Sequence, residues 1–414
     1  MKKTIFILTL LLPFGLLCAQ SNVDQLGDGN FVKVTQVGED NLSNVHTWGS
    51  YNAFSFVDQA DDGVNNSYVY QDADGNSVNV SQTTDLTGWL DENLTVIDQD
   101  GDWNSAKVTQ IGNEATWFGS KRLAFIDQDG DENEADVTQD GKWLTADIFQ
   151  GGNENEAIVD QEGNGVLSLT IQEGNKNESD VTQVGNVLFT IVDQPGYRNE
   201  ADVEQGGLLL NADVLQHGSR NDAVVQQVGS LQNADIEQYG SRGTAKQYQG
   251  KDKYYAANSA DDKYNDAKIY QGGNVSWGTK AIQSQEGQQN DANIYQDAGL
   301  WSKAQQIQVN DEEGYTWPLG TDVNQADIQQ FGGVLNTAYQ LQYYPGGDTG
   351  ADPNVANLVQ NGSLNYSQEV QIGGDNESTV SQVGNVNISA VYQNVNEIGD
   401  PEFSGLPWPL SLDH

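Results

Sequence analysis

Glutamine side chains recur in this sequence at a fixed interval, and a carboxamide both donates and accepts hydrogen bonds. Between residues 128 and 249 a glutamine stands at every eleventh residue. A buried amide without a partner is costly, but identical amides that stack in register bond to their own copies. The chemistry we expect is therefore structural. The predicted ladder consists of Gln128, Gln139, Gln150, Gln161, Gln172, Gln183, Gln194, Gln205, Gln216, Gln227, Gln238 and Gln249.

Glycine and asparagine keep the same interval. Each of these glutamines except the last is followed two residues later by a glycine, which adopts positive φ at little cost. We therefore expect turns at Gly130, Gly141, Gly152, Gly163, Gly174, Gly185, Gly196, Gly207, Gly218, Gly229 and Gly240. Asparagine begins only alternate segments, so the true repeat has 22 residues in two unequal halves. The asparagines expected to stack with the glutamines are Asn133, Asn155, Asn177, Asn199 and Asn221.

The spacing within each half predicts the elements that hold these side chains. Asparagine or an apolar residue, a small residue, valine or isoleucine, and glutamine fill every second position, which is the period of a strand with one inward face. Strand, turn, strand, turn makes one 22-residue rung, and the sequence predicts an all-β protein, a β-solenoid with parallel strands stacked in register. About 14 rungs at the ~4.8 Å strand spacing give a rod roughly 65–70 Å long. The alternative, solvated loop amides, conflicts with the unbroken phase.

The repeat divides the chain into parts. Residues 1–19 are typical of a signal peptide, because a basic start precedes an apolar run that ends at Ala19. Repeats with insertions fill residues 20–127, the regular block fills 128–249, and further interrupted repeats fill 250–396. Residues 397–414 form a non-repeat tail with prolines.

Interruptions of the repeat also affect the expected register. Tyr254 to Ala260 reads as a degenerate copy, so Asn265, 44 residues after Asn221, is expected to continue the Asn221 register. Insertions between strands are expected near Thr83–Glu92, Ile111–Lys121, Val309–Val323 and Tyr343–Pro353.

Composition excludes several classes of function. The 414 residues include 18 Lys+Arg and 60 Asp+Glu, for a net charge of −42. That balance excludes binding to nucleic acid through phosphate contacts and argues against attraction to an anionic membrane surface. After the leader no apolar stretch is long enough to span a membrane.

Residues for catalysis or metal binding do not gather in the sequence. His46, His217 and His414 are isolated, and no nucleophile motif accompanies them. The Asp-Gly-Asp sequences at 100–102 and 129–131 suit a turn better than a calcium loop. We therefore expect no enzyme, no cofactor and no metal.

The pattern Q-x-G-x-x-N-x-A-x-x-x-Q, as in Gln128, Gly130, Asn133, Ala135 and Gln139, resembles the repeat of curlin, the subunit of curli fibres. Curli are extracellular functional amyloids of bacteria, and the resemblance runs from about Gln25 to Gln393. It implies secretion through an outer-membrane pore with chaperones. It also implies polymerisation on the cell surface, with itself or related curlin-like subunits, into fibres for adhesion and biofilm matrix.

Three roles stay open within this resemblance: major subunit, nucleator or minor subunit, and a capped monomeric β-solenoid adhesin that does not polymerise. The proline-containing tail favours the capped rod, because proline blunts a strand edge.

Two sets of outward residues bear on association. Carboxylates follow the asparagines at Glu134, Glu156, Glu178, Glu200 and Asp222 and would stack one rung apart, so we expect them to delay association until acid or divalent cations neutralise them. Tryptophans are expected in turns and insertions, where they offer an aromatic surface for adhesion or glycan contact or pack loops on the rod: Trp48, Trp89, Trp103, Trp117, Trp143, Trp277, Trp301 and Trp317.

Overall fold

The computed structural model consists of β-strands without helices in the residues that it describes. These are residues 19–38, 41–48, 52–60, 64–84, 92–112, 121–250, 264–272, 277–287, 290–297, 299–310, 324–344, 354–374 and 376–393. The strands are β1 Gln20–Gln25, β2 Phe31–Gln36, β3 Leu42–Trp48, β4 Phe54–Ala60, β5 Val64–Asp72, β6 Ser77–Thr84, β7 Glu92–Asp100, β8 Ser105–Gly112, β9 Lys121–Asp129, β10 Glu134–Lys142, β11 Leu144–Gly151, β12 Glu156–Asn164, β13 Leu167–Asn175, β14 Glu178–Tyr197, β15 Glu200–Ser219, β16 Asp222–Ser230, β17 Asn233–Ser241, β18 Thr244–Gln249, β19 Asp266–Gly272, β20 Lys280–Gly287, β21 Asn290–Asp297, β22 Lys303–Asn310, β23 Asn324–Phe331, β24 Thr337–Tyr344, β25 Val355–Asn361, β26 Tyr366–Ile372, β27 Glu377–Val383 and β28 Ile388–Gln393.

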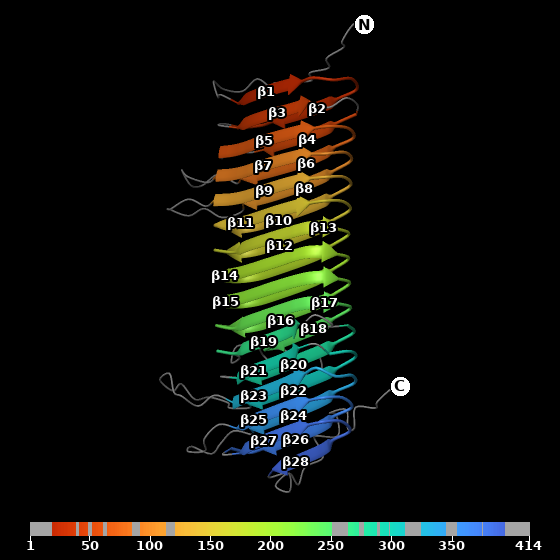
Figure 1. Cartoon of the computed structure of the whole chain (residues 1–414). Coiled ribbons are helices and arrows are strands. Elements are labelled where there is room, and N and C mark those ends of the chain that lie inside the picture. The colour runs from red at the N-terminus through yellow and green to blue at the C-terminus, as the bar shows by residue number, and fades with distance from the viewer. Residues whose placement is uncertain are drawn as a thin grey trace, which may run out of the picture.

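Figure 1 shows these strands stacked into one straight rod, with the chain running from one end to the other. Each strand pairs in parallel with the strand one full turn later, as β10 does with β12. Successive strands alternate between two faces, which we call face A (β2, β4, β10, β28 and their partners) and face B (β1, β3, β11, β27 and their partners). The first halves of β14 and β15 lie in face A and their second halves in face B. The predicted all-β solenoid with parallel strands is confirmed.

The described strands make 15 rungs, because 28 strands, two of which contribute to both faces, provide 30 strand segments at two per rung. Rung 1 contains β1 and β2, and rung 15 contains β27 and β28. Fourteen strand spacings of ~4.8 Å give a rod of about 67 Å.

Register follows the 22-residue interval only in the regular block. Glu134 pairs with Glu156, and Asp222 with Thr244. The offset is 23 residues between β2 and β4, 29 between β7 and β9, and 36 between β18 and β20. The rung is therefore not uniform in length.

The expected register of Asn265 is wrong. Asn233 pairs with Asp266, so Asn265 follows Gln232 in face B and does not continue the face A column of Asn221. In that face A column Asn221 is followed by Gly243, because Asp222 pairs with Thr244. The offset at Asn265 is 33 residues, which is three halves and not four, because the proposed copy Tyr254–Ala260 is no paired strand of the rod and lies outside the described residues.

The two edges of the rod differ in their connections. On the turn edge, where the chain passes from face B to face A, short turns join the strands in every rung of the regular block. On the insertion edge it returns from face A to face B, and all four insertions predicted from the sequence fall there, between β6 and β7, β8 and β9, β22 and β23, and β24 and β25. The turn edge is therefore the side of the rod where the chain is most regular.

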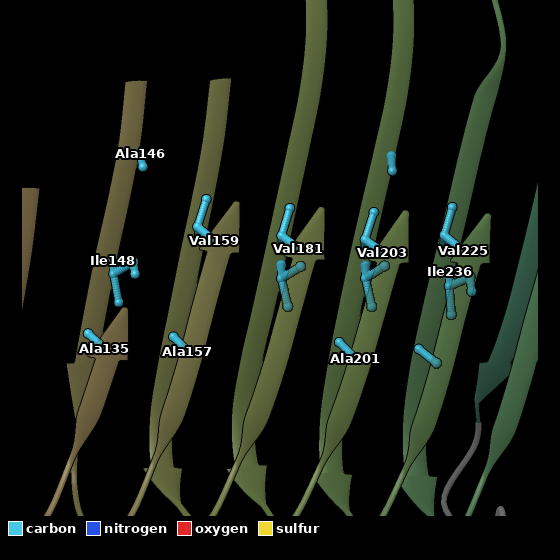
Figure 2. Close-up of a cluster of buried hydrophobic side chains, with 14 of the residues drawn as sticks. Ala135, Ala146, Ile148, Ala157, Val159, Val181, Ala201, Val203, Val225 and Ile236 are labelled. Carbon is cyan, nitrogen blue, oxygen red and sulfur yellow. The ribbon is translucent and has the colours of Figure 1, made fainter. Parts of the chain in front are cut away.

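A thin apolar core lies between the faces. Figure 2 shows the alanines and branched residues of successive rungs in rows, with Val159, Val181, Val203 and Val225 aligned along face A. Their side chains are at most 1 % exposed. A second cluster of Leu144, Val166, Leu188 and Leu210 fills the start of the face B strands where asparagine is absent. This apolar column separates the rod interior from the insertion edge.

Two predicted parts of the chain lie outside the described residues: the signal peptide, apart from Ala19, and the tail from residue 397 onward. The described part of the chain contains no helix of the length and apolar character needed to cross a membrane.

Candidate functional site

The glutamines form two parallel ladders, one per face. The run of twelve divides between them, because successive glutamines lie on opposite faces. In face A, each Nε2 donates to the Oε1 of the next rung at 2.7–3.0 Å, without a break from Gln36 to Gln393. In face B the same bonds, also 2.7–3.0 Å, run from Gln71 to Gln382. All amides donate towards the C-terminal end, so both ladders are polar.

The second hydrogen of each amide ties the faces together. Gln150 of face B donates to the carbonyl oxygen of Glu134 in face A at 2.9 Å, and Gln161 of face A to that of Thr145 in face B at 2.9 Å. Gln150 is 2 % exposed and Gln161 is fully buried. Each glutamine therefore meets its hydrogen-bonding needs inside the rod, which offsets the cost of its burial.

The asparagines of the regular block do not form amide-to-amide bonds. The Oδ1 of Asn133 accepts the backbone N–H of Asn155 at 3.0 Å, and the Nδ2 of Asn133 donates to the carbonyl of Gly152 at 2.8 Å. Asn155, Asn177, Asn199 and Asn221 repeat this arrangement. The expectation of a side-chain ladder is thus wrong for this block, because the glycine carbonyl lies within reach of the amide.

Glycine is required mainly by close approach. Nine of the eleven turn glycines have positive φ, whereas Gly196 and Gly240 do not. A Cβ on Gly152 would overlap the carbonyl oxygen of Gly174 in the next rung, and a Cβ on Gly196 would overlap that of Gly218. The left-handed residue of each turn is a different one, the residue just before the asparagine position, such as Glu154 with φ 56°. The sequence analysis missed this position because it is not glycine.

A third ladder was also missed. Face A carries valine two residues before the glutamine up to Val225, and then Gln247, Gln283, Gln306 and Gln340. These amides bond in series at 3.0 Å, and Gln340 donates to the carboxylate of Glu369 at 2.7 Å. Ser378 also donates to Glu369, whose pKa is raised chiefly because burial penalises its charge. The signal was available as Gln-x-Gln pairs such as Gln247 and Gln249.

The predicted acidic column is stacked one residue per rung at the start of the face A strands. Glu134, Glu156, Glu178, Glu200 and Asp222 are register partners in that order. Burial, followed by the charges of Glu178 and Glu134, raises the pKa of Glu156. Burial and the charge of Asp222 raise that of Glu200. The column therefore holds like charges at strand spacing.

The described tryptophans all lie outside the core. Trp48 ends β3 and is 56 % exposed, while Trp103, Trp143 and Trp301 lie in turns and are 48–63 % exposed. Trp277 packs edge-on against Trp301 at 4.4 Å between ring centroids. Trp89, Trp117 and Trp317 lie outside the described residues.

Histidines and carboxylates do not assemble into a reactive centre. His46 stacks on Tyr70, and His217 on Tyr239, each at 5.2 Å between ring centroids. His414 lies outside the described residues. Among the residues that are described, no group of three or more His, Cys, Asp and Glu side chains is arranged to hold a metal ion.

The two end rungs expose strand edges of the same kind. Inward residues that are buried elsewhere are partly exposed at both ends, such as Val23 and Val34 at one end and Val391 at the other. Outward residues donate their N–H towards the C-terminal neighbour, as Tyr366 does to the carbonyl of Asn387 at 2.8 Å. By the same alternation, the N–H groups of Ile388, Ala390 and Tyr392 in β28 point to the open end.

Comparison with protein families gives two matches to the same description, curlin associated repeat, at residues 91–116 and 210–240. A search of curated proteins found no match. The first match contains β7 and β8, which together form one rung, and the second contains β16 and β17. Both are copies of the rung that the rest of the described chain repeats, and the chain therefore belongs to the curlin repeat family.

Proposed function

We propose that this protein is a subunit of an extracellular curli-type fibre that serves cell adhesion and biofilm matrix and grows by stacking of its end rungs. The observation that carries the proposal is the whole number of rungs. The chain begins on face B with β1 and ends on face A with β28, so β27 and β28 of one copy present the two columns that β1 and β2 of the next would continue.

The polarity of the ladders gives the junction a direction. Gln393 donates to the carbonyl of Glu377 at 2.8 Å, and its other amide hydrogen meets no acceptor among the described residues. At the other end, no described group donates to the Oε1 of Gln36, which begins the same ladder. Stacking of the C-terminal end on the N-terminal end of the next copy would extend the face A ladder across the junction, in agreement with edge-to-edge strand addition.

The resemblance supports the route by which such a subunit would reach its place of assembly. A signal peptide in residues 1–19, an outer-membrane secretion pore, and chaperones that hold the exported chain unfolded belong to this proposal. The competing function is a capped, monomeric adhesin, and assembly behaviour separates the two.

Electron microscopy of the purified mature chain, diluted from denaturant and incubated for a day, tests the proposal. We expect long unbranched fibres from the unchanged chain. Ala390→Pro removes an N–H that points to the open end and should leave only rods of about 67 Å, because β28 keeps its bonds to β26. Ala390→Val retains the N–H and serves as the matched control. Single rods from the unchanged chain would instead identify a capped adhesin.

A further inference from the structure

Charged residues on the turn edge are sorted along the length of the rod. Each turn in the regular block exposes two consecutive residues there, the second with positive φ. In rungs 3 to 6 the charged members of these pairs are all acidic: Asp74, Asp102, Asp131, Glu132 and Glu154. In rungs 7 to 10 they are all basic: Lys176, Arg198, Arg220 and Arg242. Four of the 18 Lys and Arg residues of a chain with charge −42 thus stand in consecutive rungs of one edge.

Backbone bonds between turns hold this basic column in place. The N–H of Arg198 donates to the carbonyl of Asn175, that of Arg220 to Tyr197 and that of Arg242 to Ser219, at 2.9–3.0 Å. The side chains must therefore project one rung apart, at the ~4.8 Å strand spacing.

The three arginines have no carboxylate partner within 4.0 Å among the described residues. Lys176 pairs with Glu154 at 2.6 Å, at the point where the acidic and basic halves meet. Arg198 instead stacks on Tyr197 and Arg242 on Trp277, with 5.0 and 4.8 Å between the guanidinium carbon and the ring centroid. All three arginines are exposed, so their charge is available to a partner.

We propose that the turn edge is a docking surface for a second copy of this chain, which lies alongside in antiparallel orientation. A two-fold axis between rungs 6 and 7 places rung 3 opposite rung 10, rung 4 opposite 9, rung 5 opposite 8 and rung 6 opposite 7. Every acidic rung then faces a basic one. Asp102 lies opposite Arg220, and Asp131 and Glu132 lie opposite Arg198. An interface of this isologous kind is the commonest route to a homodimer.

Spacing favours a second copy over an unrelated polyanion. Both charge sets repeat at the rise of the same rung, so they match along the whole contact without adjustment of either rod. The turn edge also carries none of the four predicted insertions, so two edges can approach closely. The column next to it adds Asp100 and Asp129 to the acidic half, although it also places Glu173 in the basic half.

The geometry fixes how far the two rods overlap. Twelve rungs overlap and three project at each end, so the pair would be about 82 Å long with stepped ends, compared with about 67 Å for one rod. Rung 15 of each copy stays uncovered. Lateral pairing therefore goes beyond end-to-end growth and does not depend on it.

Reciprocal charge reversal tests the proposal. One variant of the mature chain combines Arg198→Glu, Arg220→Glu and Arg242→Glu, and the other combines Asp102→Lys, Asp131→Lys and Glu132→Lys. Both are made with Ala390→Pro, and association is measured by sedimentation and by rod width and end shape in electron microscopy. We expect pairs from the Ala390→Pro chain, at least tenfold weaker association of each reversed variant alone, and recovery of pairs in their equimolar mixture.

A control triple with Lys33→Glu, Lys280→Glu and Lys303→Glu makes the same change in net charge at exposed lysines of face A and should still pair. Persistent pairs in the arginine variant, or no recovery in the mixture, would overturn the proposal. Binding of alginate that is lost in the arginine variant, with no lateral pair of the unreversed chain, would assign the basic column to an anionic polysaccharide and would also overturn it. Because width reports lateral pairing and length reports end growth, the two proposals fail separately.

Discussion

At the scale of single residues, Glu369 is the least expected member of the interior. It occupies a ladder position of face A, is 1 % exposed and accepts hydrogen bonds from Gln340 and Ser378. These bonds favour its charged form, but the larger effect of burial raises its pKa above the ordinary 4.5. A folded-state pKa above the unfolded value means that the folded state binds the proton more tightly, so its ionisation at neutral pH weakens the fold.

Glu369→Gln should therefore stabilise the rod at pH 7 by about 1 kcal/mol or more, because an amide both donates and accepts in the third ladder. The gain should shrink as the pH falls through the raised pKa and vanish below about 4.5, where the wild-type carboxyl is protonated in both states. Denaturant unfolding at pH 7 and pH 4 measures it. An equal gain at both pH values would contradict the assignment.

The neighbouring glycines Gly151 and Gly152 separate close approach from composition. A Cβ on Gly152, at φ 100°, overlaps the carbonyl oxygen of Gly174, whereas nothing lies within 4 Å of a Cβ on Gly151. We expect Gly152→Ala to cost about 2–4 kcal/mol in the free energy of unfolding and Gly151→Ala to change it by less than about 1 kcal/mol. Equal effects in the unfolding curves of the two variants would show that stacking does not select glycine.

At the scale of elements, the strands were predictable because their inward residues alternate with period two, as in Ala135, Val137 and Gln139. Parallel pairing followed from the fixed repeat, since only in-register stacking brings copies together. The turns were predictable in position but not in conformation. The left-handed residue is chemically diverse, as Trp143, Glu154 and Val187 show, so sequence type carries no signal there.

The candidate site was predictable to a similar degree. The positions of the glutamines were evident, but their division between two faces required the register. The bonding of Asn133 to the Gly152 carbonyl depends on how closely two turns approach, which no spacing reveals. The register at Asn265 failed because one extra half of the repeat contributes no paired strand.

One defect in a ladder provides a test at this scale. In face B, Thr47 stands where glutamine is expected between Gln25 and Gln71, and neither Gln25 Nε2 nor Thr47 Oγ1 finds a hydrogen-bond partner. Thr47→Gln should extend the ladder to the first rung and stabilise the N-terminal end by about 1–2 kcal/mol. Amide hydrogen exchange of β1 and β3 should slow, while β27 serves as the internal control. Unchanged exchange in β1 would contradict the prediction.

At the scale of the whole molecule, negative charge opposes the fold that the ladders support. Burial raises the pKa of outward carboxylates on both faces, including Asp160, Asp180 and Asp202 in face A and Asp127 and Asp213 in face B. Nearby carboxylates add to the shift, as Glu162 does for Asp160 and Asp180 for Asp202. The summed effect is a rod that gains stability when it takes up protons.

We therefore expect the free energy of unfolding to rise as the pH falls from 7 through these raised pKa values. The gain is complete below the ordinary values of 3.8 for aspartate and 4.5 for glutamate. Denaturant titrations of Ala390→Pro rods between pH 7 and pH 4 measure the trend without fibre growth. A salt concentration of about 1 M should reduce it by screening. A decline in stability over this range would contradict the prediction.

The confinement of the long insertions to one edge has a consequence for how such a chain can change. A segment added between a face A strand and the next face B strand leaves the interior columns untouched, because surface loops tolerate added length at a small entropic cost. One face of the rod edge can thus acquire new sequences independently of the core. Foreign peptides inserted between β8 and β9 or between β22 and β23 would be displayed in a row, at separations set by whole multiples of the strand spacing.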